Sequence, residues 1–486
     1  MPATLTAPSP DQAAPVDTHA AAAQTSGLAP ASGPAQAPGR DRVPSAEENT
    51  TPPRRAGLAG RIWAALAAPL LLSVVVQNAA NFGFHAVVGR ILPPGDYGAL
   101  GAVLAIMVLL SVPLTALQAA ASSLVSSHGW DDDSVRRTLR GTALWSVLAG
   151  FAVLAATPLI QDYFRLASAV DAAVLAPFVA VSVALAVARG LLLGDRQVTP
   201  VAWTFLLGTA GRLAFGLALV IPFGVTGALV GTLAGEVVAL VVALVPIHRR
   251  SGLVPGAAAL DLRTVAAAGF AVTGLFLFST VDLLLARHYL PDAETGAYVA
   301  AATIGKVVLA LPAAAMSVYY PRLVSGWRLE RNAGALRTAF VVVSGLAILG
   351  GLVVAAVPGL LLKLLYGGNF ADAAGLVRLL AVIAALTSIV SVLTYASLAR
   401  KSLAVVVPWL GAALEIALIA RSHGDASAVA RGSLMALVPT LLVMVVWEGG
   451  AWWRAMRRGV PLPRGRHAAP RAARSSRAGS TRRRAR

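Results

Sequence analysis

Long apolar runs separated by short polar breaks make up the chain from about residue 62 onward. A helix that crosses a membrane needs about 20 mostly apolar residues, at a rise of about 1.5 Å per residue. On that basis twelve spans are predicted, near residues 62–86, 98–121, 138–160, 170–190, 200–221, 225–246, 264–286, 297–320, 337–358, 373–397, 403–420 and 429–449. The expected fold class is an all-α integral membrane protein with about twelve transmembrane helices.

One polar break occurs twice. Arg90–Ala99 reads Arg-Ile-Leu-Pro-Pro-Gly-Asp-Tyr-Gly-Ala, and in Leu290–Ala297 the pair Leu-Pro is again followed after four residues by Gly-Ala. Corresponding residues are 198 positions apart, and with one inserted residue the match continues through Pro113 and Pro312. A parallel repeat of about half a chain is typical of membrane transporters. Prolines at equal places in the two repeats are candidate bending points of the helices, or static kinks.

Composition divides the chain into five predicted regions. The first segment is rich in Ala, Pro, Ser, Thr and Gln and has no apolar period, so it is expected to be disordered. The last segment is Arg-rich and is also expected to be disordered, while the longest hydrophilic connection falls where the repeats should join. The regions are an N-terminal tail 1–56, an N-lobe 57–247, a cytoplasmic linker 248–263, a C-lobe 264–450 and a basic C-terminal tail 451–486.

Charge predicts the orientation. Hydrophobic residues make up 57% of the chain and charged residues only 13%, with a net charge of +18. Most Lys and Arg residues outside the spans fall in alternate loops and the tails, and the positive-inside rule makes that side cytoplasmic. We therefore expect a multi-pass protein of the plasma (inner) membrane with both termini in the cytoplasm. Its basic loops and tail are expected to contact anionic lipids rather than nucleic acid.

Several kinds of chemistry are not indicated. The chain contains no cysteine, so disulfides and thiolate sites are excluded. It has no phosphate-binding loop, no His-Glu-x-x-His, no Gly-x-Ser-x-Gly and no dinucleotide fingerprint. Asp96 lies in a turn-like Pro-Pro-Gly-Asp-Tyr-Gly sequence and is interpreted as a turn or cap residue. The prediction is a transporter, not an enzyme, without cofactor or metal site.

A polar stripe interrupts the first span. Gln77, Asn81 and His85 recur at intervals of four residues, with Asn78 beside them, so they share one helix face. Such a stripe indicates either a water-filled lumen or hydrogen bonds to a neighbouring helix.

Charged residues inside other spans are the remaining candidates for function. An ionised side chain at the centre of a membrane helix costs about 2.5–3.5 kcal/mol on insertion scales, so it usually faces a cavity or a partner. The deep charges either line a transport cavity or pair with one another. Arg189, close to the end of its span, is expected to reach the inner surface. The deep charges are Arg212, Glu236, Asp282, Lys306 and Glu415.

Four stretches carry a resemblance to a known family. They are Arg90-Ile-Leu-Pro-Pro-Gly-Asp-Tyr-Gly98, Val281-Asp282-Leu283 through Leu290-Pro291 to Gly296-Ala-Tyr298, Pro321-Arg322-Leu323, and Leu365-Tyr366-Gly367-Gly368-Asn369-Phe370. In order and spacing over about residues 60–450 the chain resembles the multidrug/oligosaccharidyl-lipid/polysaccharide flippase superfamily, within it the polysaccharide-biosynthesis (O-antigen-type) branch.

The resemblance implies two six-helix lobes around a central cavity that opens alternately to the two sides. It implies translocation of a lipid-linked oligosaccharide or polysaccharide precursor, carried on a polyprenyl diphosphate, from the inner to the outer leaflet, with a coupling ion as a further possible partner. Arg212 and Lys306 are expected to meet the diphosphate, and Asn and Gln groups the sugar hydroxyls. The alternative is a drug/cation antiporter of the same fold, which would use Asp282, Glu236 and Glu415 as cation or proton sites.

Overall fold

The computed structural model describes residues 58–128, 130, 132–249, 262–325 and 329–457, and every element within these ranges is a helix. The described helices belong to one compact unit. The predicted N-terminal tail, residues 250–261 of the predicted linker and residues 458–486 of the predicted C-terminal tail lie outside this part. The last helix continues to Arg457, beyond the predicted boundary at 450.

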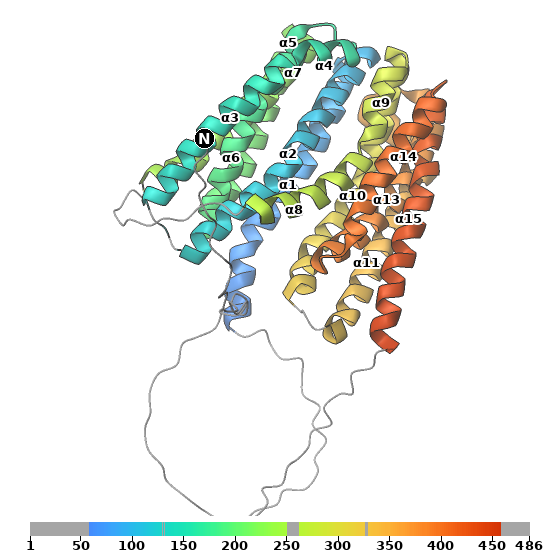
Figure 1. Ribbon diagram of the computed structural model, residues 1–486. Helices are drawn as coiled ribbons and strands as arrows, with labels where there is room; N and C mark the ends of the chain where they lie inside the picture. Colours follow the sequence, from blue (N-terminus) through green and yellow to red (C-terminus); the bar gives the residue numbers. More distant parts are fainter. Residues whose placement is uncertain (1–57, 129, 131, 250–261, 326–328, 458–486) are drawn as a thin grey trace, which may run out of the picture. The chain divides into compact units, whose positions relative to one another are not determined.

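The first half of the chain, blue to green in Figure 1, forms the helices α1 to α7. Within this half α2 and α3 pack on α6, and α1 and α6 pack on α7. The bounds are α1 Leu58–Ile91, α2 Pro94–His128, α3 Asp132–Ala155, α4 Thr157–Tyr163, α5 Ala169–Ala173, α6 Leu175–Gly194 and α7 Val198–Arg249.

The second half, yellow to red in Figure 1, forms the helices α8 to α15 and two short 3₁₀ turns. Here α10 and α11 pack on each other and on α13, while α14 and α13 pack on α15. The bounds are α8 Leu262–Phe278, α9 Val281–Tyr289, α10 Asp292–Ser325, α11 Leu329–Ala356, α12 Pro358–Tyr366, η1 Ala371–Ala373, α13 Ala374–Ala399, η2 Leu403–Val406, α14 Val407–Arg421 and α15 Ala426–Arg457.

The all-α membrane fold is confirmed, and each of the twelve predicted spans falls on a helix or a pair of helices. By length and apolarity, seven helices of the described part qualify as spans, or up to nine if each of two bent pairs is one span. The full count of twelve stays a prediction.

The predicted turn between the fifth and sixth spans lies inside α7. Gly224 has φ +56° and ψ −130°, a backbone conformation that glycine adopts most readily. The arms on either side of it pack together through small residues: an added Cβ at Gly208 would lie 2.9 Å from Ala239 Cβ, and one at Gly211 would lie 3.2 Å from Gly235 Cα. α7 is therefore a helical hairpin, closely packed as small residues allow in membranes.

Two predicted spans are bent instead of continuous. α8 and α9 meet at Ser279–Thr280 with a bend of 45°, and α11 and α12 meet at Val357 with a bend of 78°. Pro358 begins α12, a position where its missing N–H costs little. The first half has a similar arrangement, because the short helix α4 follows α3 and has Pro158 in its first turn.

The two halves touch where the repeated sequence begins α2 and α10. An added Cβ at Gly98 would lie 2.9 Å from the backbone N of Gly296, its counterpart in the repeat. One at Gly95 would lie 3.0 Å from Asp292 Cβ. We call this the hairpin end, defined by Leu92–Gly98 and Leu290–Gly296. Because corresponding positions of the repeat meet here, the two halves are related at this point by a local pseudo-two-fold axis.

Candidate transport cavity

In the first half, the predicted polar stripe and the predicted deep arginine come together. Arg212, on the first arm of α7, donates a hydrogen bond of 2.8 Å from a terminal guanidinium nitrogen to Asn81 Oδ1 on α1. Its guanidinium carbon lies 4.4 Å from the centroid of the Phe84 ring. Its Nε is buried and has no hydrogen-bond partner among the residues that the structure describes. The stripe thus joins two helices through Asn81, and one buried donor of the arginine is not used in that contact.

His85, one turn beyond Asn81, links this group to the second half. Its Nδ1 lies 3.2 Å from the hydroxyl of Tyr97, and that hydroxyl lies 3.2 Å from the hydroxyl of Tyr366 on α12. The charges of Arg212 and Lys306, one from each half, both act on His85. His85 is therefore connected to α12 of the second half through the hydroxyls of Tyr97 and Tyr366.

The start of the stripe is more open. Gln77 is half-buried and Asn78 is exposed on α1. The spacing puts Gln77 on the same face as Asn81 and His85. These two amides extend the polar face of α1 away from the hairpin end.

Glu236 lies on the second arm of α7 and interacts electrostatically with Arg189 and Arg212. Arg189 was expected to reach the inner surface, but its side chain packs within the first half: its Nε donates to Thr204 Oγ1 at 2.8 Å, and its guanidinium lies 4.1 Å from the Phe205 ring centroid. Thr204 is fully buried. Glu236 is thus close enough to the two arginines of the first half to interact with their charges, and both interpretations of the deep charges stay open for it.

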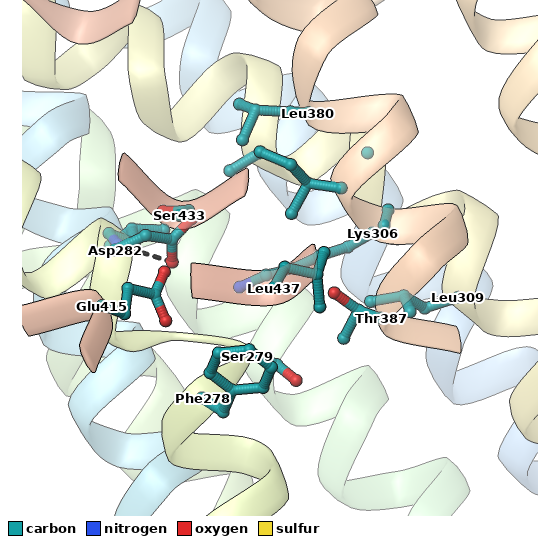
Figure 2. A pocket seen from close by; sticks show the side chains of 15 residues that line it. Phe278, Ser279, Asp282, Lys306, Leu309, Leu380, Thr387, Glu415, Ser433 and Leu437 are labelled. Carbon is teal, nitrogen blue, oxygen red and sulfur yellow. Dashed lines mark hydrogen bonds between the residues drawn. The ribbon is translucent and has the colours of Figure 1, made fainter. Parts of the chain in front are cut away.

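The second half contains a cavity with about 520 Å³ of empty space, including the part open to solvent. Side chains from α8, α9, α10, α13, α14 and α15 line it, and among them are Asp282, Lys306 and Glu415. Figure 2 shows the Lys306 side chain reaching from α10 into the space in front of the two carboxylates. Three of the five deep charges are thus brought together, although Glu415 on α14 lies 109 residues after Lys306 on α10.

The bend in the seventh span positions Asp282. Ser279 Oγ donates to the carbonyl of Leu275 at 2.8 Å, and α9 begins two residues later. In the first turn of α9 the backbone N–H groups have no helical partner, and Asp282 Oδ1 accepts one of them, from Leu283, at 2.7 Å. Its other oxygen accepts from the hydroxyl of Tyr298 at 2.7 Å.

Glu415 is the most enclosed of the candidates, with 2% of its surface exposed. It lies beside Ser433, and its charge acts on that of Asp282. Its Oε2 has no hydrogen-bond partner among the described residues. Lys306 interacts electrostatically with Asp282. The cavity therefore holds two acidic groups and one basic group, so one cation or one proton would balance its charge.

Several residues of the site were not predicted. Tyr97, Tyr298 and Tyr366 are each fully buried. The hydroxyl of Tyr97 contacts His85 and that of Tyr366, and the hydroxyl of Tyr298 donates to Asp282. Phe370 completes the aromatic group, 5.7 Å from Tyr97 between ring centroids. All four lie in the stretches that carry the family resemblance. An aromatic residue inside a repeated hairpin was the sequence signal that could have identified such a site residue.

Comparisons with known proteins agree with this arrangement. A family described as polysaccharide biosynthesis protein matches residues 67–327, which is more than half of the chain. No curated protein matches its sequence.

Solved structures of the multidrug resistance MATE family, of the MOP superfamily, are similar in fold. An outward-facing MATE transporter has a TM-score of 0.55 at 18% identity, covering 81% of this chain and 95% of its own. MATE in the straight conformation has a TM-score of 0.56 at 16% identity, covering 81% and 96%. A MOP superfamily transporter from Pyrococcus furiosus, for which reversed pocket polarity suggests a different function, has a TM-score of 0.54 at 19% identity, covering 80% and 95%. These likenesses show that the chain has the multi-pass membrane fold expected from its sequence, the fold of MOP superfamily structures.

Proposed function

The chain belongs to the polysaccharide biosynthesis protein family, and we propose that it is a flippase for a lipid-linked oligosaccharide or polysaccharide precursor. The family supports a glycan as cargo, and the fold is that of MOP superfamily transporters. The proposed cargo combines an anionic diphosphate, many hydroxyl groups and a polyprenyl chain that stays in the lipid.

The observation that carries the proposal is the position of two cations from opposite halves. Arg212 donates to Asn81, one turn from His85 on α1, and Lys306 lines the cavity of the second half. Arg212 keeps an unpaired buried Nε, and a guanidinium suits phosphate oxygens because its donors form a planar fork. A diphosphate supplies the negative charge that these two groups can share.

Neutral polar groups suit the sugars. Gln77 and Asn78 extend from the cation pair along α1, and Ser279 and Thr387 line the cavity of the second half. Amide and hydroxyl groups both donate and accept hydrogen bonds, as sugar hydroxyls require. The proposed path thus places the diphosphate near His85 and the glycan along the polar faces.

The direction of transport follows from the predicted orientation. The hairpin end faces outward if the basic loops are cytoplasmic, and both termini then lie inside the plasma membrane. A precursor assembled on the inner leaflet would enter from the opposite side and leave when the hairpin end opens. No chemistry on the substrate is part of the proposal.

The test replaces Arg212 and Lys306 together with Gln and follows precursor movement in liposomes with a leaflet-specific glycan probe. The expected result is loss of most transport while the protein remains folded. Arg431→Gln is the matched control, because Arg431 is an exposed arginine paired with Asp425 in the same half. Unchanged transport in a folded double variant would refute the site assignment.

A drug/cation antiporter is the second candidate, favoured by one observation. The half-buried carboxylate Asp282 and the buried carboxylate Glu415 share a cavity, and one oxygen of Glu415 has no hydrogen-bond partner in the described part of the chain, which suits a cationic substrate or a coupling ion. Drug sensitivity in a deletion strain whose surface polysaccharide is normal would support it. Loss of surface polysaccharide without drug sensitivity would exclude it.

A further inference from the structure

We propose that Arg90 and Arg287 are two latches, related by the repeat, that hold the hairpin end closed and must both release in each transport cycle. The inference rests on the proposed alternating access, but it concerns the gate and not the cargo. It follows from contacts between the halves that the cavity does not use.

The first latch joins the end of α1 to α12. Arg90 Nε donates to the carbonyl of Leu365 at 2.8 Å, and a terminal nitrogen donates to the carbonyl of Leu364. In return, Asn369 Nδ2 donates to the carbonyl of Gly89 at 3.4 Å. The helix end of one half is thus bound to a short helix of the other.

The second latch joins the end of α9 to the segment after α4. Arg287 Nε donates to the carbonyl of Phe164 at 2.8 Å, and a terminal nitrogen donates to the carbonyl of Arg165 at 2.7 Å. In return, a terminal nitrogen of Arg165 donates to the carbonyl of Arg287 at 2.7 Å and to that of Leu290.

The two latches have the same construction. The carbonyls that accept in return, of Gly89 and Arg287, are 198 residues apart, which is the period of the repeat, and the two latch arginines are 197 apart. Each arginine ends the first span of its repeat and binds carbonyls at the end of a short helix, α12 or α4. Carbonyls at a helix C-terminus lack helical partners and carry partial negative charge, so a guanidinium is a suitable donor for them.

The latches differ in strength. The side chain of Arg287 is buried and also pairs with Asp292 at 2.9 Å, and next to it the rings of His288 and Tyr163 stack at 4.0 Å. Arg90 is exposed. Charge-assisted hydrogen bonds are stronger where water is excluded, so the Arg287 latch is expected to contribute more to closure.

A static clamp would use the same contacts, but only a gate makes the cavity accessible when it is broken. The chain has no cysteine, so Ser279→Cys, on the cavity wall, gives a single labelling site. Sealed vesicles of both orientations are treated with a membrane-impermeant maleimide. Labelling from the hairpin side is compared among Arg90→Gln, Arg287→Gln, the double variant and the control Arg431→Gln.

The labelling rate from the hairpin side is expected to rise about tenfold in Arg90→Gln, as loss of a charge-assisted hydrogen bond implies, more than that in Arg287→Gln, and further in the double variant. The control keeps the rate of the parent. If Arg287→Gln does not fold, Arg287→Lys, which keeps the charge but not the fork, takes its place.

An unchanged rate in the folded double variant would overturn the inference. The readout is independent of cargo. Increased labelling without any glycan transport would support the latches and refute the proposed function. Glycan transport with an unchanged labelling rate would refute the latches and support the proposed function.

Discussion

Gly98→Ala is predicted to weaken closure of the hairpin end while leaving the fold intact. The new Cβ would lie 2.9 Å from the backbone N of Gly296 and 3.1 Å from Thr295 Cβ. Favourable contacts between heavy atoms begin near about 3.5 Å, so α2 and α10 must separate by roughly half an ångström at this point.

The magnitude follows from two separate effects. Overpacking costs about 1–3 kcal/mol, and replacing a helical glycine with alanine contributes about 0.5–1 kcal/mol in favour of the helix. The helix contribution is equal in the open and the closed state and raises only the stability of the fold, so closure is weakened by the overpacking cost, about 1–3 kcal/mol, which is roughly a 5- to 150-fold change in the ratio of closed to open protein.

The assay measures thermal unfolding in detergent and maleimide labelling of Ser279→Cys from the hairpin side. Gly141→Ala on α3 is the matched control, because nothing lies within 4 Å of its added Cβ. We expect the control to stabilise the protein by about 0.4–1 kcal/mol without changing labelling, and Gly98→Ala to increase labelling. If Gly98→Ala behaved like Gly141→Ala, the close contact between the halves would be wrong.

Two further predictions concern charged side chains. Lys306→Gln should lower the free energy of unfolding by about 1 kcal/mol or less, because Lys306 is exposed and its charge interacts with half-buried Asp282. Adding Asp282→Asn should restore most of that loss in thermal unfolding, and an additive loss would contradict the pairing. Arg400→Gln should cost about 3–5 kcal/mol, because it leaves Glu448, only 4% exposed, without its ion pair. Glu448→Gln in the same chain should recover much of it, and full stability of the single variant would refute this reading.

The membrane fold could be predicted because it depends on local composition. A span must be apolar over its whole length, so helices such as α2 and α13 stand out without knowledge of their neighbours. The repeat could be predicted for a related reason: Gly98 and Gly296 lie where the halves meet, and the close approach there requires small residues.

The bends in the helices could be predicted only in part from the sequence. Pro358 marks the start of α12, but Ser279 and Thr280, where α8 ends and α9 begins, carry no proline or glycine. The bend there depends on a side chain that bonds to the preceding turn and on packing against other helices. A span count by composition therefore runs across both breaks.

The contacts of the candidate site could not be predicted, because no pattern in the sequence gives the distances between residues on different helices. Asn81 and Arg212 are 131 residues apart when they form their hydrogen bond, and the register of α1 on α7 decides that they meet. Arg287 and Arg400 were counted as loop charges in the orientation argument. The structure gives them partners, backbone carbonyls for Arg287 and the carboxylate of Glu448 for Arg400. Only the packed structure separates an orienting charge from a structural one.

The central claim is that glycan-lipid crosses the membrane through a cavity that must open at the hairpin end. Cysteines in place of Gly95 and Asp292 test it, because their Cβ atoms would lie 3.0 Å apart, close to the roughly 3.5–4.5 Å of a disulfide. The measurement is the rate at which a polyprenyl-diphosphate-linked oligosaccharide changes leaflet in liposomes containing this variant, oxidised and then reduced. Transport that stops on oxidation and returns on reduction, with the cysteine-free protein unaffected by the oxidant, is the predicted result. Equal transport by the cross-linked protein, or none by the cysteine-free protein, would contradict the account.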